Sequence, residues 1–229
     1  MFCYAEAAGL LPIKGIIHAA GVQEHALISE MQDATQVAAV LNSVVGPKIC
    51  GTRNLYDAVQ AHKCELDIFV LYSSVSAFLG LTGGSVYAAA NGALDAFAHY
   101  GRNLGIPACS IQWGAWTEIG MAASALEGKD LSATAGFFTG VVDDALAGKA
   151  LNGLMGRQSR AEVAVMEMNW GRFLLQYDSP PAIFTSCVPS PDAGSLSSFG
   201  STLLGMFRDG VILPLSLSLP LALTLTLNP

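Results

Sequence analysis

The spacing of apolar residues along the chain predicts short buried strands that alternate with helices. From Asp33 to about His62 apolar residues recur at helical spacing, and Gly46-Pro47 should break or kink this helix. An Ala-rich helix is expected over Val86–Gly105, after a Gly-rich loop, and a less regular helical region over Ser124–Leu154. Three apolar runs are typical of buried strands: Ile13–Gly21, Leu66–Ser74 and Pro107–Trp116. A final strand is expected over Ala161–Trp170, where apolar and polar residues first alternate and the sequence then becomes polar.

Strands and helices that alternate in this way predict a parallel sheet with helices on both faces. Ligands of such sheets bind beyond the carboxyl ends of the strands. Small or polar residues follow the strands at that end: His18–Gly21, then Ser73 and Ser74, then Trp113-Gly114. We therefore expect these three strand ends to form one crevice.

The character of the chain changes after about Ser179. Residues 179–229 are expected to be a Pro/Ser/Gly linker followed by a low-complexity apolar tail, both disordered. The tail approaches the length of a membrane span, but Pro214, Pro220 and alternating Ser and Thr argue against a helix. Its period of two suggests a strand-like tail without function rather than a membrane anchor.

Composition excludes several classes of protein. With 52% hydrophobic and 13% charged residues and a net charge of −7, the chain is neither disordered nor suited to bind nucleic acid. Five scattered cysteines without a Cys-x-x-Cys pair favour a reducing compartment, and we expect a cytoplasmic protein because no secretory signal is evident. Four isolated histidines predict no metal site.

Polar residues near the second strand suggest proton-transfer chemistry. An enzyme that reduces a ketone with hydride must protonate the developing alkoxide, and a tyrosine can do so when a nearby ammonium lowers its pKa. Tyr87 and Asn91 share one helix face, and Ser74 at its strand end could orient a carbonyl oxygen beside them. Lys48 follows the helix break at Gly46-Pro47, which could turn its side chain inward.

Six segments in order resemble the ketoreductase domains of modular polyketide and fatty acid synthases, which are short-chain dehydrogenase/reductase relatives. The segments are GIIHAAGV, KICGTRNL, FVLYSS, VYAAANGALDAFAHY, IPACSIQWGAW and MEMNWGRF. The resemblance covers residues 11–173, which we take as a partial ketoreductase-like domain. In that family the lysine comes from the earlier helix, and an asparagine stands four residues after the tyrosine.

The resemblance implies roles for particular residues. Tyr87 would be the general acid, Ser74 the carbonyl-orienting donor, Lys48 the partner of the tyrosine and ribose, and Asn91 the holder of a relay water or of the lysine. It also implies NADPH as cofactor, an acyl carrier protein with a phosphopantetheine-tethered β-ketoacyl substrate, and other synthase domains as partners. The residues implied to contact the cofactor are Ala19, Ala20, Gly21, Ser73, Trp113 and Gly114.

The sequence departs from the family in its amino-terminal part. It contains no Gly-x-Gly-x-x-Gly loop to cradle a pyrophosphate, so we expect an incomplete Rossmann-like, doubly wound sheet that lacks about three amino-terminal β-α units. Gln23-Glu24-His25 and Leu79 replace the family's stereochemical markers, which leaves the hydroxyl configuration unassigned.

Two functions therefore stay open. The chain is either the catalytic half of an active reductase, with the cofactor half supplied from elsewhere, or a catalytically inactive truncated fragment or structural half-module of a synthase. An epimerase or ordinary alcohol dehydrogenase is disfavoured because Asn91 stands where those need lysine. A serine hydrolase is excluded by the absence of a Gly-x-Ser-x-Gly elbow.

Overall fold

The computed structural model describes residues 8–9, 12–24, 26–31, 33–116, 142–154, 160–187, 216–218 and 222–224. The chain divides into two compact units, one of Met1–Gln112 with Leu154–Glu162 and one of Trp113–Gly153 with Val163–Pro229.

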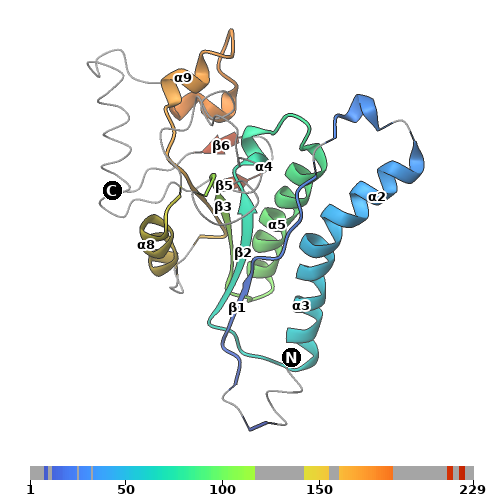
Figure 1. Cartoon of the computed structure of the whole chain (residues 1–229). Helices are drawn as coiled ribbons and strands as arrows, with labels where there is room; N and C mark the ends of the chain where they lie inside the picture. The colour runs from blue at the N-terminus through green and yellow to red at the C-terminus, as the bar shows by residue number, and fades with distance from the viewer. Residues whose placement is uncertain are drawn as a thin grey trace. The chain divides into compact units, whose positions relative to one another are not determined.

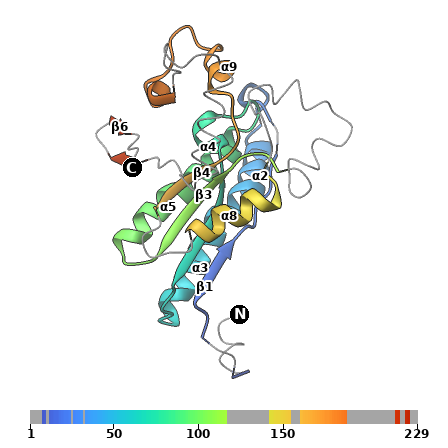
Figure 2. The same cartoon turned by 90° about the vertical axis from the view of Figure 1, so that its left-hand side faces the viewer.

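The described strands confirm the predicted parallel α/β architecture. The four strands of the main sheet follow one another in the order β1-β2-β3-β4 (Figures 1 and 2). β1 runs parallel to β2, with Gly15 opposite Ile68 and His18 opposite Leu71. The strands span β1 (Gly15–His18), β2 (Ile68–Ser74), β3 (Ala108–Trp113) and β4 (Glu162–Val165).

The helical segment before β2 is continuous but changes its winding at the predicted break. It consists of α2 (Ala34–Val45), a π-helical turn η2 (Gly46–Cys50) and α3 (Gly51–Ala61) (Figure 1). Pro47 has no N–H and its ring crowds the preceding turn, which explains why the α-helical bond pattern cannot continue there. The N–H of Gly51 instead reaches back to the carbonyl of Gly46.

The segment after β2 differs from the predicted Gly-rich loop, because it contains a one-turn helix, α4 (Ser76–Leu79). The Ser74 hydroxyl accepts a hydrogen bond from the Ser76 N–H at 3.2 Å, which satisfies a donor at the start of that turn. Gly80 then ends α4 with φ of +80°, a conformation that suits glycine.

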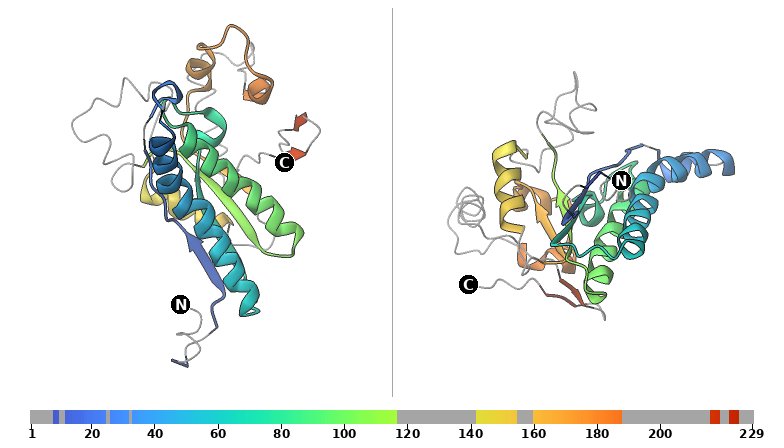
Figure 3. Two further views of the ribbon diagram at one scale, coloured as in Figure 1. Left: turned by 90° about the vertical axis from the view of Figure 1, so that its right-hand side faces the viewer. Right: turned by 90° about the horizontal axis from the view of Figure 1, so that it is seen from below.

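The long helix α5 (Ser85–Asn103) packs with α3 over one face of the first strands (Figure 3). Gly105, with φ of +81°, reverses the chain after α5. The Phe97 ring forms edge-on contacts with Tyr56 and Phe69, at centroid distances of 5.7 and 6.0 Å. The buried core between these elements comprises Ile16, Val59, Phe69, Leu71, Leu94, Ala98, Ile106 and Ala108.

The second unit is built around the ends of β3 and β4 and an aromatic cluster. The Gly114 N–H donates to the Val165 carbonyl at 2.9 Å, which continues the strand pairing. This unit contains most of α8 (Asp144–Leu154), and also α9 (Trp170–Leu174) and the 3₁₀ helix η3 (Ala182–Cys187). Trp170, Phe173, Tyr177 and Phe184 contact one another through their rings.

The carboxyl-terminal segment is described only in part. Within residues 179–229, η3 and an antiparallel pair, β5 (Ser216–Ser218) and β6 (Ala222–Thr224), have regular structure. The rest of that segment, and residues 124–141 of the predicted helical region, lie outside the described residues. No described helix is long and apolar enough to cross a membrane.

Candidate active site

Lys48 lies in the π-helical turn η2, and its side chain points into the first unit. The residue is only 2% exposed, and its Nζ donates a hydrogen bond to the Tyr72 carbonyl at the end of β2, at 2.9 Å. The same Nζ lies 5.5 Å from the centroid of the Tyr87 ring, within the range of a cation–π interaction. The widened turn therefore places a buried ammonium beside the predicted proton donor.

Tyr87 and Asn91 lie one turn apart on α5, and both side chains are buried. The Asn91 Nδ2 donates to the Tyr87 backbone carbonyl at 2.8 Å, which holds the carboxamide against the helix. Burial raises the pKa of the Tyr87 phenol, and the side chains of Asn91 and Ser74 oppose this shift. The structure thus brings together Lys48, Ser74, Tyr87 and Asn91, the four residues predicted to be catalytic.

The pKa values of Lys48 and Tyr87 differ from the expectation in one respect. Burial lowers the pKa of Lys48 to about 8, and the negative charge of Asp95 opposes this shift. The ammonium was expected to lower the pKa of Tyr87, yet that pKa is raised because desolvation dominates.

The predicted cofactor residues fall into two groups. In the first unit, Ala19 and Ala20 are exposed and Gly21 is half-buried directly after β1, a strand end lined by small groups. Ser73 is 5% exposed, and its hydroxyl donates to the Asn91 carbonyl at 3.2 Å.

The other two predicted cofactor residues belong to the second unit. Trp113 is buried, and its ring lies 5.1 Å from that of Trp116. A Cβ on Gly114 would come within 3.0 Å of the Cβ of Met166, the residue that follows β4, so packing alone favours glycine there. Contact of these residues with a cofactor stays a prediction.

Two buried polar residues near Lys48 were not predicted to take part. The Nε2 of His18 on β1 lies 3.3 Å from the Lys48 carbonyl oxygen, which links β1 to η2. Asp95 lies on α5 one turn beyond Asn91, and its charge acts on Lys48. Its spacing in Tyr87-x₃-Asn91-x₃-Asp95 was the available signal, because residues four apart share a helix face.

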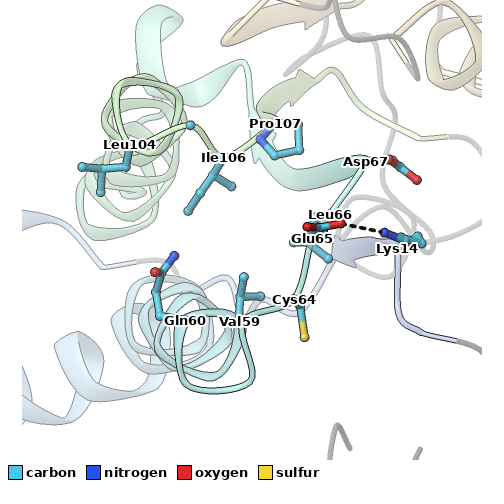
Figure 4. Close-up of a pocket in the computed structure, with 11 residues that line it drawn as sticks. Lys14, Val59, Gln60, Cys64, Glu65, Leu66, Asp67, Leu104, Ile106 and Pro107 are labelled. Atoms are coloured by element: carbon cyan, nitrogen blue, oxygen red, sulfur yellow. Dashed lines mark ion pairs between the residues drawn. The ribbon is translucent and has the colours of Figure 1, made fainter.

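A pocket of about 530 Å³ lies at the opposite end of the strands (Figure 4). It is lined by residues just before β1, β2 and β3, including Lys14, Asp67 and Pro107, and by the end of α3. The Lys14–Glu65 ion pair at its rim spans 3.6 Å and is solvent-exposed. Ligands of parallel sheets bind at the carboxyl ends of strands, so this pocket is separate from the predicted site.

Comparison with known proteins shows the family to which this chain belongs. The KR domain model matches residues 3–118, slightly more than half of the sequence. The chain belongs to the KR domain family. These ketoreductase domains are parts of polyketide synthases and members of the short-chain dehydrogenase/reductase superfamily.

Solved ketoreductase structures are similar to most of this KR chain. An A-type ketoreductase from a modular polyketide synthase aligns with a TM-score of 0.64 and 29% identity, over 82% of this chain and 37% of that one. The first ketoreductase of the tylosin synthase aligns with a TM-score of 0.62 and 36% identity, over 76% of this chain and 36% of that one.

Curated relatives are much longer proteins. A mycocerosic acid synthase-like polyketide synthase of Mycolicibacterium smegmatis is 42% identical over 121 residues, 52% of this KR chain and 6% of that protein. A highly reducing polyketide synthase of Aspergillus fumigatus is 33% identical over 160 residues, 70% of this chain and 6% of that protein. The matched segments therefore span only 6% of the length of these multidomain synthases.

Proposed function

We propose that this KR chain is the proton-donating half of an NADPH-dependent ketoreductase that reduces a carrier-protein-bound β-ketoacyl group to the β-hydroxyacyl group in polyketide biosynthesis. The observation that supports this proposal is the convergence of Lys48, Ser74, Tyr87 and Asn91 at the carboxyl end of β2. None of these four residues by itself indicates a ketoreductase. Together they supply an acid, a carbonyl-binding hydroxyl, a buried cation and a carboxamide.

Each side chain has a chemical task in this mechanism. The Ser74 hydroxyl donates to the ketone oxygen and stabilises the negative charge that develops there. The Tyr87 phenol donates its proton to the same oxygen as the carbonyl becomes an alkoxide. Bound NADPH would supply the hydride.

The proton must then be returned to Tyr87. The Lys48 ammonium stabilises the phenolate that remains, and with a pKa of about 8 it is mostly charged at pH 7. The Oδ1 of Asn91 is buried without a hydrogen-bond partner among the described residues, so it can accept a hydrogen bond from a relay water or from the lysine.

The residues of this chain fit one part of the cofactor better than the other. Small residues at the end of β1, Ala19 and Ala20, leave space for a nucleotide, and Lys48 can donate to a ribose hydroxyl. The sequence has no Gly-x-Gly-x-x-Gly loop for the pyrophosphate. We propose that a separate polypeptide, or sequence outside these 229 residues, provides that cradle.

The multidomain organisation of the relatives supports a substrate that is bound to a carrier protein. The relatives are multidomain polyketide synthases, in which the growing chain is passed between domains. The alternative is an inactive fragment or a structural half-module, and the missing pyrophosphate loop favours it for the isolated chain.

Cofactor binding and complementation distinguish these functions. We expect no binding when NADPH fluorescence is titrated with micromolar chain alone. After fusion to the amino-terminal β-α units of the tylosin ketoreductase, we expect NADPH oxidation with a β-ketoacyl thioester. A fused protein that binds NADPH but stays inactive would support the structural half-module, and tight binding by the chain alone would contradict the division into halves.

A further inference from the structure

A polar stripe runs along α5 and extends beyond the proposed site. Its members, Tyr87, Asn91, Asp95 and His99, follow one another at intervals of four residues, so they lie along one face of the helix. The first two belong to the proposed site, whereas the other two bond residues of the sheet. The second half of the stripe is therefore placed to fix the helix that carries the proposed proton donor.

The amide of Gln112 on β3 connects this stripe to the next strand. Its Nε2 donates to the Asp95 Oδ2 at 2.8 Å and to the Glu162 Oε1 at 2.7 Å, so both of its protons are used. Gln112 is 1% exposed, and Glu162, the first residue of β4, is also buried. One amide group thus joins α5, β3 and β4 in the interior of the first unit.

The other oxygens of the two carboxyls also have partners. The Ser110 hydroxyl donates to the Asp95 Oδ1 at 2.6 Å, and the His99 Nε2 lies 3.2 Å from the Glu162 Oε2. Gln112 itself keeps its Oε1 buried without a hydrogen-bond partner among the described residues. The reverse orientation of the amide would turn this oxygen toward both carboxyls, so the two N–H bonds determine how Gln112 lies.

A separate hydrogen bond holds α5 one turn before Asp95. The Ser73 hydroxyl at the end of β2 donates to the Asn91 carbonyl at 3.2 Å. A single bond fixes one point of a helix, and a second bond farther along also fixes the direction of its axis. Apolar packing is less directional than such bonds. The bond from Gln112 to Asp95 supplies the second point, and the direction of the axis decides where Tyr87 lies, one turn before Asn91.

We propose that Gln112 is a positioning residue of the reductase: by bonding carboxyls of α5 and β4, its amide sets the direction of α5 and thereby the place of the Tyr87 phenol. The Lys48 ammonium belongs to η2 and lies over the Tyr87 ring, 5.5 Å from its centroid, so it can report a displacement of that ring. The catalytic consequence rests on the proposed function, whereas the displacement can be measured without it.

Variants that exchange donors and acceptors separate hydrogen bonding from size. Gln112→Glu keeps the length of the side chain but sets three carboxyls against one another, which should displace α5. The triple variant Asp95→Asn/Gln112→Glu/Glu162→Gln restores both bonds with their direction reversed, because two amides then donate to one carboxylate. Ile111→Ala is the control for lost stability, since it opens a cavity beside Gln112 on β3 and removes no hydrogen-bonding side chain.

The measurement that does not depend on activity is the ring-current shift of the Lys48 ε-methylene protons in the full 229-residue chain. The sequence has five lysines, so ¹³Cε-lysine labelling gives few NMR signals. Lys48→Arg identifies the signal required, and Tyr87→Leu gives its position without the ring. All samples carry Ile17→Glu, which replaces an exposed apolar residue of β1. We expect Gln112→Glu to lose most of the ring-current shift, the triple variant to recover it, and Ile111→Ala to keep it.

Three results of this measurement would overturn the proposal. The first is an unchanged Lys48 signal in Gln112→Glu. The second is a triple variant that is unfolded by circular dichroism or has the same shift as Gln112→Glu. The third is an equal loss in Ile111→Ala, because the effect would then come from lost stability. If Gln112→Glu does not fold, recovery of both the fold and the Lys48 signal in the triple variant supports the proposal.

The fused reductase gives the catalytic readout. There, Gln112→Glu should lower kcat by a factor of about 10–10² and leave the KM for NADPH unchanged, because the phenol is displaced while other residues hold the cofactor. The triple variant should regain kcat. An unchanged kcat of Gln112→Glu in an active fusion would overturn the positioning role. An inactive wild-type fusion would instead refute the proposed function, and the Lys48 signal would still decide whether Gln112 positions α5.

Discussion

At the scale of single residues, the Lys48 ammonium is held at a cost to stability. Its folded-state pKa of about 8 lies below the ordinary value of 10.5, so the unfolded chain binds more protons between these values. The free energy of unfolding must therefore rise with pH across that window, and the cost is present in full below pH 8. The proposed proton transfer requires a charged Lys48, whereas the folded state is more stable when Lys48 is neutral.

We expect Lys48→Met to stabilise the fold at pH 7 by about 1–3 kcal/mol while it removes the cation from the site. The gain should disappear above about pH 10.5, where the unfolded lysine is also neutral. Urea denaturation at pH 7 and pH 10.5 measures both values. Lys14→Met is the control, because Lys14 is half-exposed and its ion pair contributes little. A destabilised Lys48→Met at pH 7 would contradict the assigned burial cost.

The Tyr87 phenol is the proposed acid, and its loss should affect chemistry rather than folding. In the fused reductase, we expect Tyr87→Phe to reduce kcat by a factor of about 10²–10⁴, with NADPH affinity retained. Tyr100→Phe removes a hydroxyl from the same helix at a residue that is 57% exposed, and it should leave kcat unchanged. Equal activity of the two variants would exclude Tyr87 as the proton donor.

At the scale of elements, the junction of η2 and α3 depends on a close approach of backbone and side chain. A Cβ on Gly51 would lie 3.0 Å from the His18 Cε1, and His18 in turn contacts the Lys48 carbonyl. We expect Gly51→Ala to destabilise the chain by about 1–3 kcal/mol, because the buried His18 ring must move.

A second helical glycine provides the matched comparison. Nothing lies within 4 Å of the position a Cβ would take on Gly92 in α5, so Gly92→Ala should stabilise by about 0.5–1 kcal/mol through helix propensity alone. Opposite shifts of the urea midpoint are expected for the two variants. A shift of the same sign in both would show that His18 is not a rigid neighbour of η2.

The elements themselves could be predicted because their signals are local. Periodicity located the four strands and α5, and Gly46-Pro47 marked the change in winding, although the sequence did not show that it would be a π turn. The helix α4 was missed, because a Ser74 hydroxyl cap is a weak local signal. The hydrogen bonds of Asp95 with Ser110 and Gln112 could not be predicted, since these two residues come from a strand that only the fold brings near.

At the scale of the whole molecule, the chain corresponds to 36–37% of the two ketoreductases compared above. In the described sheet, β1 has a partner only in β2. On its helix-covered face Ile16 and His18 are buried, whereas Ile17, which points to the other face, is 53% exposed. An outer strand with an exposed apolar side chain is a site where another chain can pair or pack.

We therefore expect the isolated chain to self-associate through β1, so that its apparent mass in light scattering rises with concentration. Ile17→Glu should lower this association at least several-fold, because a carboxylate would have to be buried in the contact. Leu175→Glu is the control: Leu175 is 83% exposed but follows α9 in the second unit, and its replacement should not change the association. Fusion to the amino-terminal β-α units should suppress association without any substitution, because those units would then cover β1. A chain that stays monomeric and melts cooperatively at high concentration would show that β1 needs no partner.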